Sequence, residues 1–174
     1  MDSSPKKKLL QFLSEDIQRG DITSALLSNQ KIKAKIISRE QGVVAGVVFA
    51  RNIFRLKGSA VRIFTKDGSR LKQNQTVLQV SGNAKSILSC ERTVLNLLSR
   101  MSGIATQTNY LVSQIKKHSK KTNLYSTRKT APGLRYFDKE AVIVGGGRKH
   151  RMALDGMIMI KDNHLLLSNS MEDI

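Results

Sequence analysis

Hydrophobic residues recur at helical spacing near the start of the chain. Leu9, Leu13 and Ile17 stand four residues apart, behind a proline that suits the first turn of a helix. This spacing predicts an amphipathic helix that begins at Pro5 and ends by Gly20.

A series of short apolar segments follows, and most of them resemble strands. Residues 31–38 place isoleucine and alanine between three lysines, which predicts a half-buried strand. Residues 60–65 and 76–82 predict two more strands on either side of a turn-rich stretch. Residues 42–50 are apolar and interrupted by glycine, and this pattern fits either a strand or a buried helix.

The spacing returns to the helical period near residue 84. One row of a helix over residues 84–103 carries Ile87, Glu91, Val94, Leu98 and Met101. A second helix is expected over residues 105–121, because lysine and histidine at its end suit a helix C-terminus. We therefore predict two successive helices in this region.

The segment after residue 121 predicts a strand, a helix and another strand. Residues 122–130 form the first expected strand and residues 155–164 the second. Between them, residues 139–147 predict a short helix that runs into three glycines. This order is typical of an α/β barrel, in which functional side chains stand at the C-terminal ends of the strands.

Cationic side chains gather at those expected strand ends. Arg128 and Lys129 end the first strand, Lys161 ends the second, and His150 and Arg151 lie on the loop between them. We expect the two arginines to share one pocket with Lys161 at its floor. Arginine offers a planar fork for carboxylate or phosphate and lysine a point charge, so the group suits an anion with several charged oxygens.

Each part of this cluster also has an ordinary structural interpretation. Arg128 and Lys129 fit an exposed surface pair equally well. The glycines at 145–147 form either a flexible loop or a turn whose backbone N–H groups approach an anion.

The charge of the chain favours anionic partners. Lysine and arginine number 30 against 13 acidic residues, for a formal net charge of +17. Such a positive field suits nucleic acid, an anionic surface or small multivalent anions. Several lysine runs alternate with apolar positions, however, and for those runs a solvated surface is the simpler interpretation.

The composition and motifs exclude several classes of site. Cys90 is the only cysteine, so an intramolecular disulfide is excluded, and with three histidines the chain has too few ligands for a typical structural zinc site. The sequence has no signal-peptide or membrane-spanning run, and we expect a soluble cytoplasmic protein. Ser-His-Asp spacing, H-E-x-x-H and a P-loop are missing, and no paired carboxylates stand near the cations. Transfer chemistry on a phosphorylated or polycarboxylate substrate is therefore favoured over hydrolysis.

Five motifs, in order along nearly the whole chain, resemble the quinolinate phosphoribosyltransferase family. They read EDIQRGDITS, ERTVLNLLSRMSGIAT, TRKTAPGLR, GGGRKHRMAL and IKDNH. The resemblance implies an α/β fold with an N-terminal α/β sandwich and linking helix over residues 1–103. The first part of an open α/β barrel, the phosphoribosyltransferase domain, is then expected over residues 104–174.

The resemblance also implies an activity in NAD biosynthesis. Members of the family join quinolinate to phosphoribosyl pyrophosphate and release nicotinate mononucleotide, pyrophosphate and carbon dioxide, with Mg²⁺ accompanying the pyrophosphate. The cations found above suit this chemistry, because quinolinate is a dicarboxylate and its co-substrate a polyphosphate.

Six residues match substrate-binding positions of the family. They are Arg92, Arg128, Lys129, His150, Arg151 and Lys161. Lys129 and Lys161 are also the expected catalytic residues, and no residue matches a metal ligand. Arg92 matches an arginine that the family inserts into the neighbouring subunit's site, which implies a homodimer or higher oligomer.

The chain departs from the family in length. The 71 residues after Gly103 suffice for about two strand–helix units of a barrel. The family's later acidic residues, which hold the ribose and the metal, have no counterpart, so we expect a C-terminally truncated chain that turns over poorly or not at all.

Three other interpretations stay open at the level of sequence. A paralogue associated with molybdenum transport resembles the same motifs, although IKDNH favours the quinolinate enzyme. A basic nucleic-acid-binding module is a second, but aromatic residues make up only 5% of the chain and tryptophan is absent. A remnant that binds anions without turnover is the third.

Overall fold

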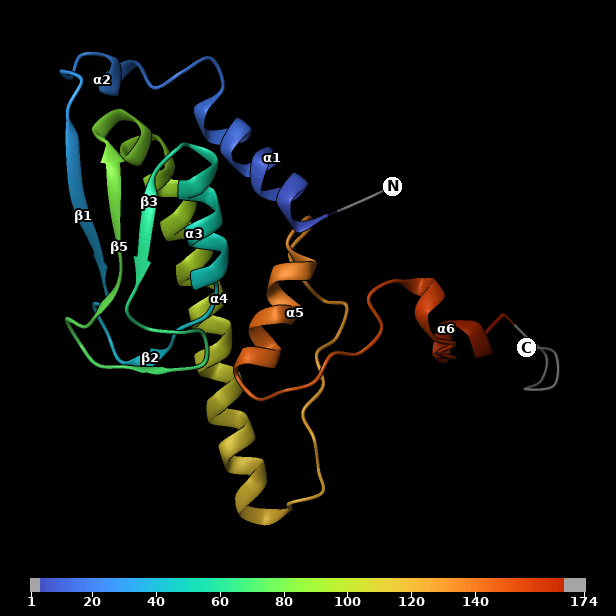
Figure 1. Ribbon diagram of the computed structural model, residues 1–174. Helices are drawn as coiled ribbons and strands as arrows, with labels where there is room; N and C mark the ends of the chain where they lie inside the picture. Colours follow the sequence, from blue (N-terminus) through green and yellow to red (C-terminus); the bar gives the residue numbers. More distant parts are fainter. Residues whose placement is uncertain (1–3, 168–174) are drawn as a thin grey trace.

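The computed structural model describes residues 4–167, and its first helix begins where the proline predicts (Figure 1). In α1 (Pro5–Ile17) the Ser4 hydroxyl accepts a hydrogen bond from the Lys7 N–H at 3.4 Å. This cap satisfies one of the backbone donors that a helix start leaves free. A one-turn helix, α2 (Ile22–Ala25), follows and was not expected from the sequence.

Three predicted strands form one antiparallel sheet. Its order is β1 (Lys31–Ile37), β5 (Thr76–Asn83), β3 (Ala60–Ile63). Alternate residues of β1 are half-buried on the side that faces the helices, while its three lysines are exposed. The alternation predicted for residues 31–38 is confirmed in β1, because one face of this strand is covered and the other is in water. The strands predicted at 60–65 and 76–82 also form, although β5 buries the neighbouring Val77 and Leu78.

The ambiguous segment at residues 42–50 contains both of its possible structures. β2 (Gly42–Val43) pairs with β4 (Arg70–Leu71), a two-residue strand that the sequence did not predict. α3 (Val47–Leu56) then begins behind Gly46, whose φ of 97° lies in the left-handed region. A glycine adopts that backbone without strain, so it turns the chain from strand to helix within four residues.

The two helices expected between residues 84 and 121 are one helix, and that prediction is wrong. α4 (Ala84–His118) runs for 35 residues without a break. A glycine inside a helix costs only about 1 kcal/mol, and the buried side chains of Met101 and Ala105 hold α4 on both sides of Gly103. The domain boundary expected at residues 103 and 104 falls inside α4 and stays a prediction.

The hydrophobic core lies between the sheet and the helices that cover it. α3 and α4 pack on its inner face, and α1 adds two leucines at the edge (Figure 1). The largest buried apolar side chains include Phe54, Ile53, Leu78, Val80, Val94 and Met101. The N-terminal part is therefore a two-layer α/β sandwich, as expected.

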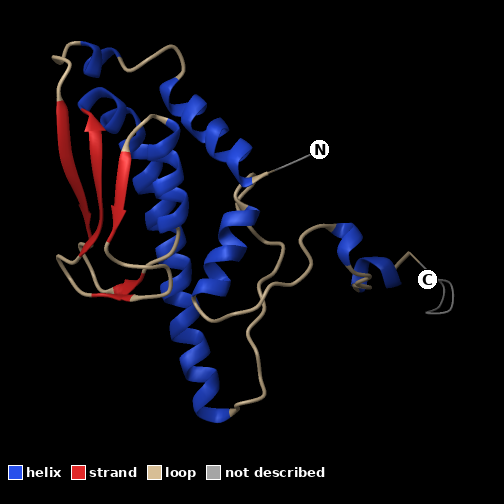
Figure 2. Cartoon of the chain, in the orientation of Figure 1, coloured by secondary structure: helices blue, strands red, loops and turns tan. Residues whose placement is uncertain are grey.

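The chain after α4 is a helix flanked by extended segments. α5 (Arg135–Val144) packs on α4, and only a one-turn 3₁₀ helix (Leu154–Gly156) and α6 (Asp162–Leu165) follow in the described residues. The strands expected at 122–130 and 155–164 are wrong: Figure 2 shows no strand after α4, and the second segment overlaps the 3₁₀ helix and α6. A strand exists only through a paired neighbour, and within residues 4–167 these segments gain no ladder, only one bridge between Tyr125 and Arg148. No helix among the described residues is long and apolar enough to cross a membrane.

Candidate functional site

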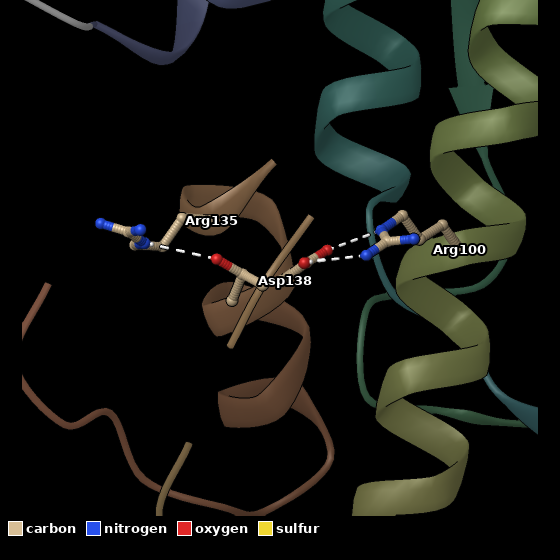
Figure 3. A network of polar contacts seen from close by, with 4 residues as sticks. Arg100, Arg135 and Asp138 are labelled. Atoms are coloured by element: carbon tan, nitrogen blue, oxygen red, sulfur yellow. Dashed lines mark hydrogen bonds and ion pairs between the residues drawn. The ribbon is translucent and has the colours of Figure 1, made fainter. Parts of the chain in front are cut away.

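α5 is fixed to α4 by an ion pair that the sequence did not predict. Arg100 Nε donates to Asp138 Oδ1 at 2.7 Å and its Nη2 donates to Oδ2 at 2.9 Å, a bidentate pair visible in Figure 3. The hydrogen bonds to Asp138 raise the pKa of the Arg100 guanidinium. The Asp138 side chain is only 7% exposed, so this pair is partly desolvated and strong.

The three glycines after α5 terminate the helix and bring it close to α4. The N–H of Gly146 donates to Ile143 O and that of Gly147 donates to Val142 O, both at 2.9 Å. Gly146 has a φ of 93°, so these bonds form a Schellman cap. The expectation that these N–H groups approach an anion is wrong, because carbonyl groups of α5 take all three of them.

Two loops that carry most of the predicted cations lie side by side after α4. The first basic loop is residues 119–134, before α5, and the second basic loop is residues 145–153, after α5. The Ser126 N–H donates to Arg148 O at 2.9 Å, and the Arg148 N–H donates to Leu124 O at 2.8 Å. The rings of Tyr125 and His150 then meet edge to face, with 6.4 Å between their centroids. The predicted juxtaposition of the two loops is thus made by a single parallel bridge rather than by a barrel.

Two buried polar atoms in the first loop lack a partner. Arg128 Nε and Ser126 Oγ are shielded from solvent and make no hydrogen bond in the described structure. A buried donor without a partner costs roughly 1–3 kcal/mol, and such groups are rare unless a ligand completes them. This is the feature of the loop that best fits a bound anion.

A buried lysine of α5 holds the second loop. Lys139 is 0% exposed, and its Nζ donates to His150 O at 2.9 Å and to Arg151 O at 2.7 Å. Burial is the largest cause of a lowered pKa at Lys139, and the nearby charges of Arg135, Arg128 and Lys149 lower this pKa further. Four cations therefore lie within electrostatic reach of one another at this side of α5.

Arg135 at the start of α5 connects the same two loops. Its Nε donates to Thr130 Oγ1 at 3.3 Å, and its Nη1 donates to Met152 O at 2.9 Å. In Figure 3 the Arg135 side chain lies on the opposite side of α5 from Arg100. The first turns of α5 therefore contact α4 through Asp138 and the basic loops through Arg135.

The remaining predicted site residues are placed more openly. Arg151 is half-buried, and its Nη1 donates to Met157 O at 2.8 Å. Lys129 and Lys161 are exposed. Lys161 precedes α6 as its N-cap residue, so it is not the pocket floor that the strand prediction implied. The described structure thus gathers Arg128, His150 and the backbone of Arg151 around α5, and joins neither exposed lysine to them by a hydrogen bond.

Arg92 lies elsewhere, on the sheet side of α4. It is exposed and lines a groove of about 820 Å³ between β1 and α4, a groove that contains none of the other five predicted site residues. Arg92 and Thr108, which packs against Gly145, are sixteen residues apart on one helix. At ~100° per residue they point in directions ~160° apart. Arg92 therefore faces away from the side of α4 on which α5 and the basic loops lie.

Sequence reasoning missed Lys139, which holds the second loop, and the Arg100–Asp138 pair, which fixes α5 on α4. Asp138 and Lys139 belong to α5, where charged residues at first suggest an exposed helix face. The signal that could have found them is the neighbouring apolar row of Phe137 and Ala141, which is fully buried and turns Asp138 and Lys139 inward.

Comparison with known proteins gives a consistent match over both parts of the chain. Residues 21–102 match the family model described as quinolinate phosphoribosyl transferase, N-terminal domain, and residues 104–174 match the model of its C-terminal domain. A probable nicotinate-nucleotide pyrophosphorylase (carboxylating) of Methanothermobacter thermautotrophicus is 40% identical over 165 residues, which are 94% of this chain and 59% of that protein. The corresponding protein of Bacillus subtilis is 40% identical over 168 residues, 95% of this chain and 57% of its own length.

Solved structures show the same similarity. The nicotinate-nucleotide pyrophosphorylase of Ehrlichia chaffeensis has a TM-score of 0.91 at 35% identity, over 99% of this chain and 64% of that one. The structure of NadC from Streptococcus pyogenes has a TM-score of 0.88 at 36% identity, over 95% and 61% of the two chains. The chain thus spans about three fifths of the length of these relatives, with their mixed α/β fold.

Proposed function

Because this chain belongs to the quinolinate phosphoribosyl transferase family, we propose that its site serves the family's reaction in NAD biosynthesis. Quinolinate attacks C1 of phosphoribosyl pyrophosphate through its ring nitrogen, pyrophosphate leaves, and the carboxylate next to that nitrogen departs as carbon dioxide. The products are nicotinate mononucleotide, pyrophosphate and carbon dioxide. A cytoplasmic location is part of the same proposal.

Quinolinate is held by the two basic loops. Arg128 and Arg151 each offer a planar fork to one of its carboxylates, and His150 binds beside them. This clamp aims the ring nitrogen at the ribose, and holding two reactants in such geometry supplies much of the rate enhancement in transfer reactions. The buried and unpartnered Nε of Arg128 supports this assignment, because a carboxylate oxygen would give it the acceptor it lacks.

The phosphoribosyl substrate is met by the exposed lysines. Lys129 stands directly after Arg128 in the first loop, and its side chain is exposed. Lys129 and Lys161 contact both substrates as the catalytic cations. Their charges stabilise the departing pyrophosphate while the ribose becomes positively charged.

Mg²⁺ enters this scheme with the substrate. Among residues 4–167 no group of three or more histidine, cysteine or acidic side chains is placed to hold a metal ion. Two carboxylates of α5 are already paired, Asp138 with Arg100 and Glu140 with Lys149. The residues described here do not fit a resident metal, and we propose that Mg²⁺ arrives as the complex of phosphoribosyl pyrophosphate.

Arg92 serves the site of a second copy of the chain. The direction of Arg92, ~160° around α4 from the α5 side, supports this assignment. An arginine there cannot join the clamp of its own chain without a rearrangement of α4, and it is free to extend into a neighbour's clamp. The proposed active unit is therefore a homodimer or a higher oligomer of such pairs.

One observation carries the proposed function: the two basic loops lie side by side, and the first of them contains a buried arginine donor without a hydrogen-bond partner. The test measures carbon dioxide release from carboxyl-labelled quinolinate by the full-length protein, with phosphoribosyl pyrophosphate and Mg²⁺. Arg128→Ala should abolish release. Arg148→Ala is the matched control, because Arg148 lies on the facing strand of the bridge with an exposed side chain, and it should leave release unchanged. Release that persists in Arg128→Ala refutes the clamp.

The shared site has its own test. Full-length Arg92→Ala and Arg128→Ala proteins should each be inactive, and mixing them should restore activity by forming one intact site in a mixed dimer. A mixture that stays inactive under conditions of subunit exchange refutes the contribution of Arg92 in trans.

A further inference from the structure

We propose that Lys139 is the positioning residue that holds His150 and Arg151 in the geometry required to bind the dicarboxylate. The inference rests on the proposed function and adds to it a residue that touches no substrate. Lys139 is placed by its own contacts: two adjacent carbonyl groups of the second loop, at 2.9 and 2.7 Å, converge on one ammonium group.

Beyond the bridge to the first loop, the backbone of the second loop is held by side chains of α5. Among the described residues, those at 149–152 make no backbone–backbone hydrogen bond, although Arg148 just before them is fixed by the bridge to the first loop. Two side chains of α5 hold their carbonyls instead, Lys139 at residues 150 and 151 and Arg135 at residue 152. α5 therefore holds the backbone from which the His150 and Arg151 side chains extend, and Tyr125 and Met157 O contact those side chains further out.

The geometry of the two carbonyls explains why an ammonium is needed. In an extended chain, successive residues point in opposite directions, and this alternation holds for side chains and carbonyls alike. Carbonyls 150 and 151 both reach the same Nζ, so the ammonium holds a local bend. An ammonium has three donors, whereas an apolar residue of similar length has none, and in its place both carbonyls would be left without these partners.

The environment of Lys139 excludes the ordinary alternatives. Its side chain is 0% exposed and two of its three donors are taken, so it is closed to a substrate as a nucleophile or Schiff-base former. The described structure pairs Lys139 with no carboxylate, so it is not half of a stabilising ion pair. A buried cation among Arg128, Arg135 and Lys149 is instead a repulsive arrangement that a bound dianion would relieve.

The test compares the Michaelis constants of the two substrates in the full-length protein. Lys139→Met should raise KM for quinolinate by about ten- to a hundredfold, since a displacement of ~1 Å in a binding group can have an effect of this size. KM for phosphoribosyl pyrophosphate should stay within about twofold of the wild-type value, because the two exposed lysines make no hydrogen bond to residue 139. Lys139→Gln keeps an amide donor for one carbonyl and should show a smaller rise.

Asp138→Asn is the matched control. Asp138 is the preceding residue of the same helix and is also buried, but it holds α4 rather than the loop. This variant should lose thermal stability and keep both Michaelis constants within about twofold of wild type, a limit far below the tenfold effect expected at residue 139.

The outcomes separate the inference from the proposed function. A wild-type protein that neither binds nor turns over quinolinate overturns the proposed function and, with it, this inference. An active wild type with an unchanged quinolinate KM in Lys139→Met overturns the inference alone, and so does an equal rise in both Michaelis constants. If Lys139→Met does not fold, Lys139→Gln decides by the same criterion.

Discussion

Gly145 is the position at which one methyl group tests how α5 is seated on α4. A Cβ at residue 145 would lie 2.5 Å from the carbonyl oxygen of Ala105 and 2.6 Å from Cβ of Thr108. Comfortable contacts between carbon atoms are ~3.5–4.0 Å, so the two helices would have to separate by about 1 Å. The φ of Gly145 is −74°, which alanine adopts freely, so Gly145→Ala adds a steric clash without backbone strain.

The size of the effect follows from the packing. The carbonyl of Ala105 belongs to the middle of α4 and cannot rotate away, so the clash has to be relieved by moving a helix. Overpacking of this kind costs about 1–3 kcal/mol. At ~2–4 °C per kcal/mol for a chain of this size, the midpoint of thermal unfolding should fall by about 2–12 °C.

Gly103→Ala is the matched control, because the same substitution is expected to raise the melting temperature there. Gly103 lies inside α4, and a Cβ there would meet no atom within 4 Å. Alanine in a helix interior is favoured over glycine by roughly 0.5–1 kcal/mol, so this variant should melt about 1–4 °C above wild type. Far-UV circular dichroism on heating measures both variants. A Gly145→Ala protein that melts at or above the wild-type temperature would refute the close packing of α5 on α4.

Four further predictions follow from the contacts described above. Arg100→Ala should destabilise the fold by about 1–3 kcal/mol in urea titrations, less than the ~3–5 kcal/mol of a fully buried pair because the arginine is 39% exposed; an unchanged midpoint would refute it. Burial raises the pKa of Cys90 to about 11, so its thiol should ignore a thiol reagent at mildly alkaline pH and react only after unfolding. Burial disfavours the charged form of Lys139 in the folded protein and lowers its pKa below the ordinary 10.5. The resulting loss of folding stability is full at neutral pH and fades as pH rises through the lowered pKa. The stability of wild type relative to Lys139→Met should therefore increase toward pH 10.5, and a difference that does not change with pH would contradict the assignment. The 174-residue chain by itself should release carbon dioxide at least about a thousandfold more slowly than enzymes of ordinary rate, because losing part of an orientation effect of ~7–11 kcal/mol is enough to do so.

The first half of the fold could be predicted because its strands find their ladder partners within the same half of the chain. The lysines of β1 alternate with residues that face α4, and β5 supplies the neighbour that makes both of them strands. The sequence predicted two helices where α4 is one, because glycine weakens helices and packing on both sides of Gly103 outweighs that tendency.

The candidate site could be predicted only in part. The motifs named the residues of both loops, yet the strands assigned to these loops have no ladder partner among residues 4–167. Lys139 escaped notice because a lysine in a helix usually faces water. Its role depends on two carbonyl groups eleven and twelve residues further along the chain, which no periodicity reveals.

The continuity of α4 affects how this chain can be divided. The matches to the two family domains meet between residues 102 and 104, in the middle of a single 35-residue helix. If the chain were cut at that point, the N-terminal fragment would lose the second half of α4, against which α5 packs. The C-terminal fragment would keep that half of the helix without the sheet that the first half covers. The two domains that sequence comparison separates therefore share one helix. A chimaera that exchanges either domain with a relative has to include the whole of α4.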